Sequence, residues 1–349
     1  MICRKTKGGE QRADGPGSRR SRLILAVLGL LLLLSVMGSL LTGRLEISLR
    51  QCVGILVSRF FEITPFWTQV QENMLCLVRL PRILTALLVG MALSIAGTSY
   101  QCIFRNPMAA PDILGASTGA AFGAALAILL GRSSVEITLW AFVSSLGCVG
   151  LVLLCSRLCR GDAVLNLILA GIMIGSLFSA ATSYLKLIAD PNDTLPAITY
   201  WMMGSLSGVG TAELQWLWLP VLLAAVPVFA LRWKMNLLTL DDEEAKSLGV
   251  NTGRTRMIVI LCATLLTAAS VAVSGIIGWV GLVIPHIARK MVGSDCRVLL
   301  PAAALLGAVF LILVDDLARS LYTTELPLGI LTAFLGVPFF LYLMISGRE

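Results

Sequence analysis

Charged side chains are scarce in this sequence. They make up 13% of its 349 residues, whereas 57% of the residues are hydrophobic. Because soluble proteins average about 25% charged residues, a water-soluble fold of this chain would lack the polar groups that must cover its surface. Each helical membrane crossing needs about 20 apolar residues, so a chain of this length accommodates about ten crossings. The composition therefore excludes a soluble enzyme.

Groups that bind metals or nucleotides are also scarce. His286 is the single histidine, which excludes a transition-metal cage of several imidazoles within one chain. The nine cysteines form no C-x-x-C pair, and no G-x-x-x-x-G-K-[ST] phosphate-binding loop occurs. The sequence predicts no catalytic residue, no metal site and no cofactor, so an ATP-driven process would need a separate ATPase subunit.

The first 22 residues are polar and basic, and they precede a long apolar run over 23–42. A secretory signal peptide also begins in this way, but its apolar core is usually only about 7–15 residues long, and no cleavage site of small residues follows here. We therefore predict two parts, a basic cytoplasmic tail over 1–22 and a membrane-embedded domain over 23–349.

Apolar stretches bounded by glycine, proline or charged residues predict an all-α polytopic membrane protein with about ten transmembrane helices. The predicted spans are residues 23–42, 80–102, 114–131, 137–156, 164–186, 213–231, 256–274, 278–292, 298–317 and 327–346. With the amino terminus inside, most of the 27 Lys and Arg residues fall in inside segments, as the positive-inside rule requires. We therefore expect both termini to lie inside.

The connection over 43–79 is predicted to lie outside. Its residues 45–61 have the pattern of an amphipathic helix at the membrane interface. Cys52 and Cys76 share this segment, and the sequence leaves open whether they form a disulfide.

The connection over 232–255 is predicted to lie inside. Four acidic residues, Asp241 to Glu244, favour the start of a short helix because carboxylates interact well with its positive end. Gly249 is positioned to end that helix. Two interpretations remain open, a solvated loop or a helix that docks its apolar side into a groove of a cytoplasmic partner.

Several stretches resemble one family of membrane transport proteins. The stretch at 243–249, E-E-A-K-S-L-G, resembles the E-A-A-x-x-x-G coupling element of ABC importer permeases. Others are R-L-P-R-I-L-T-A at 79–86, N-P-M-A-A-P-D-I-L-G at 106–115, L-I-L-A-G at 167–171, Y-W-M-M-G-S-L at 200–206, G-W-V-G-L-V-I-P-H-I-A-R at 278–289 and L-V-D-D-L-A-R at 313–319. In this order they resemble the FecCD family, the permeases for iron–siderophores, haem and cobalamin. The departures are small, with Asp241, Met108 and Trp279 standing where Gly, Leu and Phe are common.

The resemblance implies a permease domain over 23–349 that works in a larger assembly. The implied partners are a second permease subunit, in a homodimer or heterodimer, two cytoplasmic ATPase subunits, and an extracellular or periplasmic substrate-binding protein. The net charge of +7 then reflects Lys and Arg on the cytoplasmic side of the lipid bilayer and not nucleic-acid binding.

The resemblance also assigns roles to residues. Docking of the binding protein falls to Arg79, Arg82 and Arg319. Coupling to the ATPase falls to Asp241, Asp242, Glu243, Glu244, Ala245, Leu248 and Gly249, and the cytoplasmic gate to Asn106, Met108, Val164 and Leu165. The residues alone allow plainer readings: the outer arginines snorkel to the interface, residues 106–112 form an ordinary turn, and Asp315 or Asp316 pairs with Arg319 within one helix.

The resemblance implies a permease subunit, not itself an enzyme, that imports an iron chelate across the cytoplasmic membrane. A ferric siderophore is the expected cargo, and haem or cobalamin is the alternative. An ion-coupled secondary transporter is the alternative from another class, but it would need carboxylates near the bilayer midplane, where this chain has scarcely any. A receptor or scaffold without transport is the third alternative.

Overall fold

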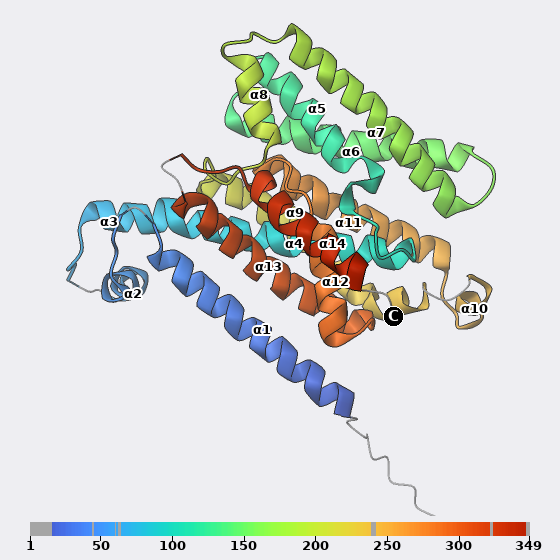
Figure 1. Ribbon diagram of the computed structural model, residues 1–349, viewed down its shortest axis with the longest axis horizontal. Helices are drawn as coiled ribbons and strands as arrows, with labels where there is room; N and C mark the ends of the chain where they lie inside the picture. The colour runs from blue at the N-terminus through green and yellow to red at the C-terminus, as the bar shows by residue number, and fades with distance from the viewer. Residues whose placement is uncertain are drawn as a thin grey trace, which may run out of the picture.

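The computed structural model describes residues 16–43, 45–59, 61, 64–238, 242–321 and 324–346, and this part of the chain is all-helical. In chain order the helices are α1 (Pro16–Leu41), α2 (Leu49–Ser58), α3 (Gln69–Asn73), the π-helical segment η1 (Met74–Arg79), α4 (Leu80–Ile103), the 3₁₀ turn η2 (Pro111–Leu114), α5 (Ala116–Leu129), α6 (Ser134–Leu158), α7 (Ala163–Ile188), α8 (Thr194–Met202), α9 (Thr211–Leu237), α10 (Asp242–Ser247), α11 (Thr252–Ser274), α12 (Val280–Val292), α13 (Cys296–Ser320) and α14 (Leu328–Ser346). Long helices packed side by side form most of the molecule (Figure 1).

The predicted all-α membrane fold is confirmed, because each predicted span lies on a helix. Seven helical stretches in the described residues are long and apolar enough to cross a membrane, those of α1, α3 to α4, α6, α7, α9, α11 and α13. The remaining three predicted spans correspond to α5, α12 and α14, of which the first two have only 14 and 13 residues. The first helix begins at Pro16, so the end of the predicted tail is helical.

The predicted outer helix over 45–61 is present as α2. Ser48 caps its amino terminus and forms a reciprocal capping box with Gln51, which satisfies two backbone donors that the helix start would leave free. Cys52 and Cys76 are both free thiols in this structure, so the disulfide that the sequence left open is not formed.

Among the seven long spanning stretches, those of α4, α11 and α13 are the most buried. Two thirds of the residues in the apolar windows of α11 and α13 are buried, against about a fifth in those of α7 and α9. Glycines allow α4 to touch its neighbours through the backbone. A Cβ atom at Gly90 would lie 2.3 Å from the Gly307 carbonyl oxygen of α13, and one at Gly97 would lie 1.7 Å from that of Gly281 in α12.

The bundle has two distinct ends. The helices α2 and α3 lie at one end and α10 lies at the other (Figure 1). Following the orientation expected from the Lys and Arg distribution, we name these the outer end and the inner end.

Because α4 and α12 touch through their backbones at Gly97, adding one methyl group there should lower the stability of the protein. Gly97→Ala forces α4 and α12 apart, and overpacking of this kind costs about 1–3 kcal/mol. We expect the apparent melting temperature of the detergent-solubilised protein to fall by several degrees. Gly147→Ala is the matched control, because no atom lies within 4 Å of a Cβ there. Equal melting temperatures for the two variants would contradict the packing described.

Candidate functional site

The three arginines predicted to dock a binding protein come together at the outer end. Arg79 ends the π-helical segment, Arg82 lies in the first turn of α4, and Arg319 lies in the last turn of α13. Arg79 and Arg82 are only 4% and 7% exposed. Their guanidinium groups therefore lie inside the bundle and not on its surface.

Arg82 holds two carboxylates from the carboxyl-terminal part of the chain. Its Nε and Nη2 atoms donate to Asp315 at 2.9 and 2.8 Å, and its Nη1 atom donates to Glu325 at 3.0 Å. Asp315 is 1% exposed, whereas the side chain of Glu325 is 27% exposed. A buried carboxylate is stable only with such a partner, so this pair fixes α4 against α13.

Arg79 and Arg319 hold the outer end of α1. Arg79 donates to the carbonyl oxygens of Leu40, at 2.7 Å, and Leu45. Arg319 donates to the Ser39 carbonyl at 2.8 Å and forms an ion pair with Asp316, three residues earlier on the same helix. The predicted pairing within α13 is confirmed for Asp316 but is wrong for Asp315, because Arg82 provides Asp315 with a better enclosed partner.

The predicted gate residues lie on two segments. Asn106 and Met108 lie in the loop between α4 and η2, where the Asn106 side-chain oxygen accepts the Met108 N–H at 2.9 Å. Val164 and Leu165 form the first turn of α7, and Asp162 caps this turn by accepting both of their N–H groups. Met108 and Leu165 are about half exposed, so both segments present apolar side chains outward.

The predicted coupling helix is present as α10, and Asp241 lies outside the described residues. Ala245 is fully buried, whereas Glu243, Glu244 and Leu248 are exposed. Gly249 has a φ of 79°, the left-handed conformation that ends helices, and its N–H bonds to the Lys246 carbonyl at 2.9 Å. The helix and the turn that follows it thus combine two exposed carboxylates with an exposed leucine.

Two polar residues near the carboxyl end of α9 were missed by the sequence reasoning. Arg105 donates from Nε to the carbonyl of Leu238 at 3.0 Å. Asn236 bridges to the start of α13, donating to Asp295 and accepting the Cys296 N–H at 2.7 Å. The only signal for Arg105 was its place directly before the predicted gate residue, and Asn236 gave none.

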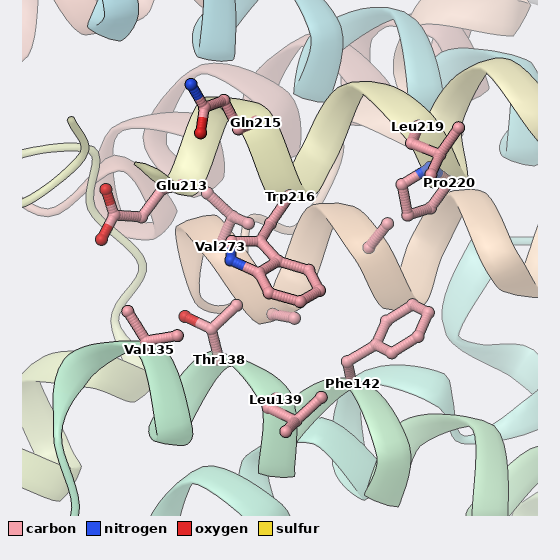
Figure 2. A pocket seen from close by; sticks show the side chains of 12 residues that line it. Val135, Thr138, Leu139, Phe142, Glu213, Gln215, Trp216, Leu219, Pro220 and Val273 are labelled. Carbon is pink, nitrogen blue, oxygen red and sulfur yellow. The ribbon is translucent and has the colours of Figure 1, made fainter. Parts of the chain in front are cut away.

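An apolar groove lies away from these residues. It has a volume of about 220 Å³ and lies between α6, α9 and α11. Trp216 of α9 and Phe142 of α6 point into the space between their helices (Figure 2). The groove contains none of the predicted docking, coupling or gate residues, so it is not part of the candidate site.

A multi-pass helical bundle with a short acidic helix between two spanning helices defines the class of an ABC importer permease. The model of the FecCD transport family matches residues 31–346, so the chain belongs to that family. The family is one of transport permeases, which are not themselves catalytic.

Named relatives differ in what they carry. The chain is 43% identical to the molybdate import system permease protein MolB of Haemophilus influenzae, over 91% of this chain and 94% of the relative. It is 40% identical to a probable iron chelatin transport system permease of Helicobacter pylori, over 78% and 82%. It is 38% identical to the hemin permease HmuU of Yersinia pestis, over 95% and 98%.

A solved structure has the same fold. It is described as an inward-facing conformation of a putative metal-chelate type ABC transporter, with a TM-score of 0.84 and 41% identity, covering 93% of this chain and 99% of that one. The relatives and this structure confirm the predicted family and fold.

The buried pair of Arg82 and Asp315 predicts a stability effect. Asp315→Ala leaves a buried guanidinium with Glu325 alone, so we expect a loss of about 3 kcal/mol, the lower end for broken buried pairs. The double variant Arg82→Met with Asp315→Leu should regain most of it, since apolar residues can replace a buried pair.

Thermal melting of the purified protein checks this effect. The control is Arg132→Ala, which breaks an exposed pair with Glu136 at 3.7 Å and should cost less than about 1 kcal/mol. A double variant no more stable than Asp315→Ala would argue against the buried-pair explanation.

Proposed function

We propose that this chain is the membrane-spanning subunit of an ATP-driven importer that carries a ferric siderophore across the cytoplasmic membrane. The observation that carries the proposal is the family match over 31–346, which includes the short acidic helix α10 at the inner end. The chain breaks no bond itself, and ATP hydrolysis belongs to two cytoplasmic ATPase subunits. Both termini lie on the cytoplasmic side.

The cargo is proposed from the chemistry of the helices together with the named relatives. The middle turns of α6, α7 and α11 carry no Asp, Glu, Lys or Arg. A metal ion whose charge is enclosed by an organic chelator crosses such surroundings at a lower desolvation cost than an unchelated dianion such as molybdate. This favours a ferric siderophore, with haem or cobalamin as the alternative. Molybdate is a second candidate, favoured by the relative that is named for its import.

Energy enters the subunit through α10. Closure of the ATPases on ATP displaces a helix that offers them Leu248, Glu243 and Glu244, which are exposed beside the buried Ala245. An exposed apolar residue flanked by charges suits a groove in a partner. Asp241, Asp242 and Gly249 complete this coupling element, and the two gate segments, with Asn106 and Met108 and with Val164 and Leu165, open and close in response.

The substrate-binding protein docks at the outer end, where one of its carboxylates replaces a hydrogen-bond acceptor that an outer arginine holds within this chain. Arg79, Arg82 and Arg319 already bind acceptors of this chain, so an incoming carboxylate must replace one of them. Among the three carboxylates that they bind, Glu325 has the most exposed side chain, at 27%. A guanidinium fork binds a replacing carboxylate in two places. A second permease subunit, identical or homologous, completes the translocation path.

Reconstitution tests the proposed function. The permease, its ATPase and its binding protein are placed in liposomes with radioactive ferric siderophore, haem, cobalamin or molybdate outside. We expect uphill accumulation of the ferric siderophore that requires ATP and stops on addition of vanadate. Accumulation of molybdate alone would replace the first cargo with the second.

The same vesicles without the ATPase are the control. We expect no uphill uptake from them under a proton or sodium gradient. Uptake there would instead establish the ion-coupled secondary transporter, and an assembly that binds cargo without moving it would establish the receptor.

A further inference from the structure

The backbone of Arg105 is held in an unusual conformation. Its φ of 50° is left-handed, and among the described residues only Trp279 is another non-glycine residue with a positive φ. Such a conformation costs about 1–3 kcal/mol and persists only where surrounding contacts fix it. Here the end of α4 supplies one such contact, because the Asn106 N–H bonds back to the Gln101 carbonyl at 3.3 Å. The Arg105 side chain adds another, a hydrogen bond from Nε to the Leu238 carbonyl at 3.0 Å.

This hydrogen bond joins two segments with different proposed roles. Leu238 is fully buried and is the residue that ends α9, directly before the connection to α10. Arg105 directly precedes Asn106, whose side chain shapes the loop that holds Met108. The bond therefore links the end of α9, which leads into the proposed coupling helix α10, to the start of the loop that carries the proposed gate residues Asn106 and Met108.

The chain before Arg105 is firmly anchored. Tyr100 donates to or accepts from Thr264 of α11 at 2.9 Å, and its ring stacks on that of Phe104 at 5.8 Å. At the other end of the loop, Gly115 has a φ of 76°. The loop of residues 105–115 thus lies between two left-handed residues, which can act as its hinges.

The end of α9, which leads into α10, is also bonded to α13. Asn236 binds Asp295 and the Cys296 N–H at the start of α13, at 2.6 and 2.7 Å. A displacement of the end of α9 therefore acts on α13, a buried helix packed on α4, and on the loop held by Arg105. Of these two, the loop has an exposed segment, residues 105–108.

We propose that Arg105 is a positioning residue that transmits movement of the coupling helix to the gate loop 105–115 through its bond to the Leu238 carbonyl. The inference rests on the proposed function and adds to it the physical link between its two inner elements. Without the guanidinium group, the ATPases still bind and cycle, but the loop no longer follows them.

Arg105→Gly tests the link while sparing the backbone, because glycine adopts a φ of 50° without strain. In the reconstituted complex we expect ATP hydrolysis within twofold of the unchanged protein and at least a tenfold fall in cargo moved per ATP. Arg160→Gly, in the exposed inner loop before α7, is the matched control and should change neither quantity.

A distance measurement separates a link from a purely structural role. Bioorthogonal spin labels at positions 107 and 163, both exposed beside the gate residues, should report a nucleotide-dependent change of distance in the unchanged complex. This change should be lost in Arg105→Gly, while the nucleotide-free distance stays the same.

The outcomes distinguish this inference from the proposed function. If the unchanged complex takes up cargo with ATP and Arg105→Gly does so equally per ATP, with the same change of distance, the inference is wrong. If Arg105→Gly does not fold, Arg105→Ala and Arg105→Asn replace it, since both remove the guanidinium group and asparagine tolerates the left-handed conformation. If the unchanged complex itself shows no ATP-dependent uptake, the proposed function fails first.

Discussion

Backbone contact along α4 is the constraint on which the rest of the structure depends. Gly90 and Gly97 allow α4 to lie directly against α13 and α12, and in a bilayer such close packing of small residues replaces the hydrophobic effect as the main attraction between helices. Because α4 is fixed in this way, residues at its two ends are held at defined positions. Arg79 and Arg82 lie at the outer end of this helix, and the loop that begins near Arg105 follows its inner end.

Polar chemistry is separated between the two ends of α4. At the outer end, charged groups satisfy one another in the pair of Arg82 with Asp315 and the pair of Arg319 with Asp316. At the inner end, two hydrogen bonds each have one charged partner, from the Arg105 guanidinium to the Leu238 carbonyl and from the Asn236 amide to the Asp295 carboxylate. Breaking a buried ion pair costs about 3–5 kcal/mol, whereas a single hydrogen bond to a charged group is worth about 1.5–3 kcal/mol. This difference suits our proposal that the buried pair of Arg82 and Asp315 stays assembled while the inner end moves.

Local properties of the sequence were sufficient to predict most of the fold. The lengths of the apolar stretches predicted spans that all lie on helices. The acidic residues before Ala245 and the glycine at 249 predicted α10, because helix starts and ends depend on residues only a few positions away. The start of α1 at Pro16 was missed, because basic residues continue a helix beyond the apolar run that defines a span.

The contacts of the site residues were not predictable in the same way. The resemblance implied that Arg82 is a docking residue, but its partner Asp315 lies 233 residues later in the chain. Leu238 likewise lies 133 residues after Arg105. Pairings of this kind depend on which helices become neighbours. The resemblance to a family gave roles for such residues, and the structure adds the acceptors that each one already holds.

The most direct test of the central claim, that movement enters the bundle through α10, is a photo-crosslinking amino acid at position 248. Leu248 is 57% exposed beside two carboxylates, so in the assembled importer the probe should capture the ATPase subunit in high yield. The same probe at Leu313 of α13, which is 49% exposed, should not. Capture of lipid or of this chain alone at position 248, in a complex that is active in uptake, would contradict the claim.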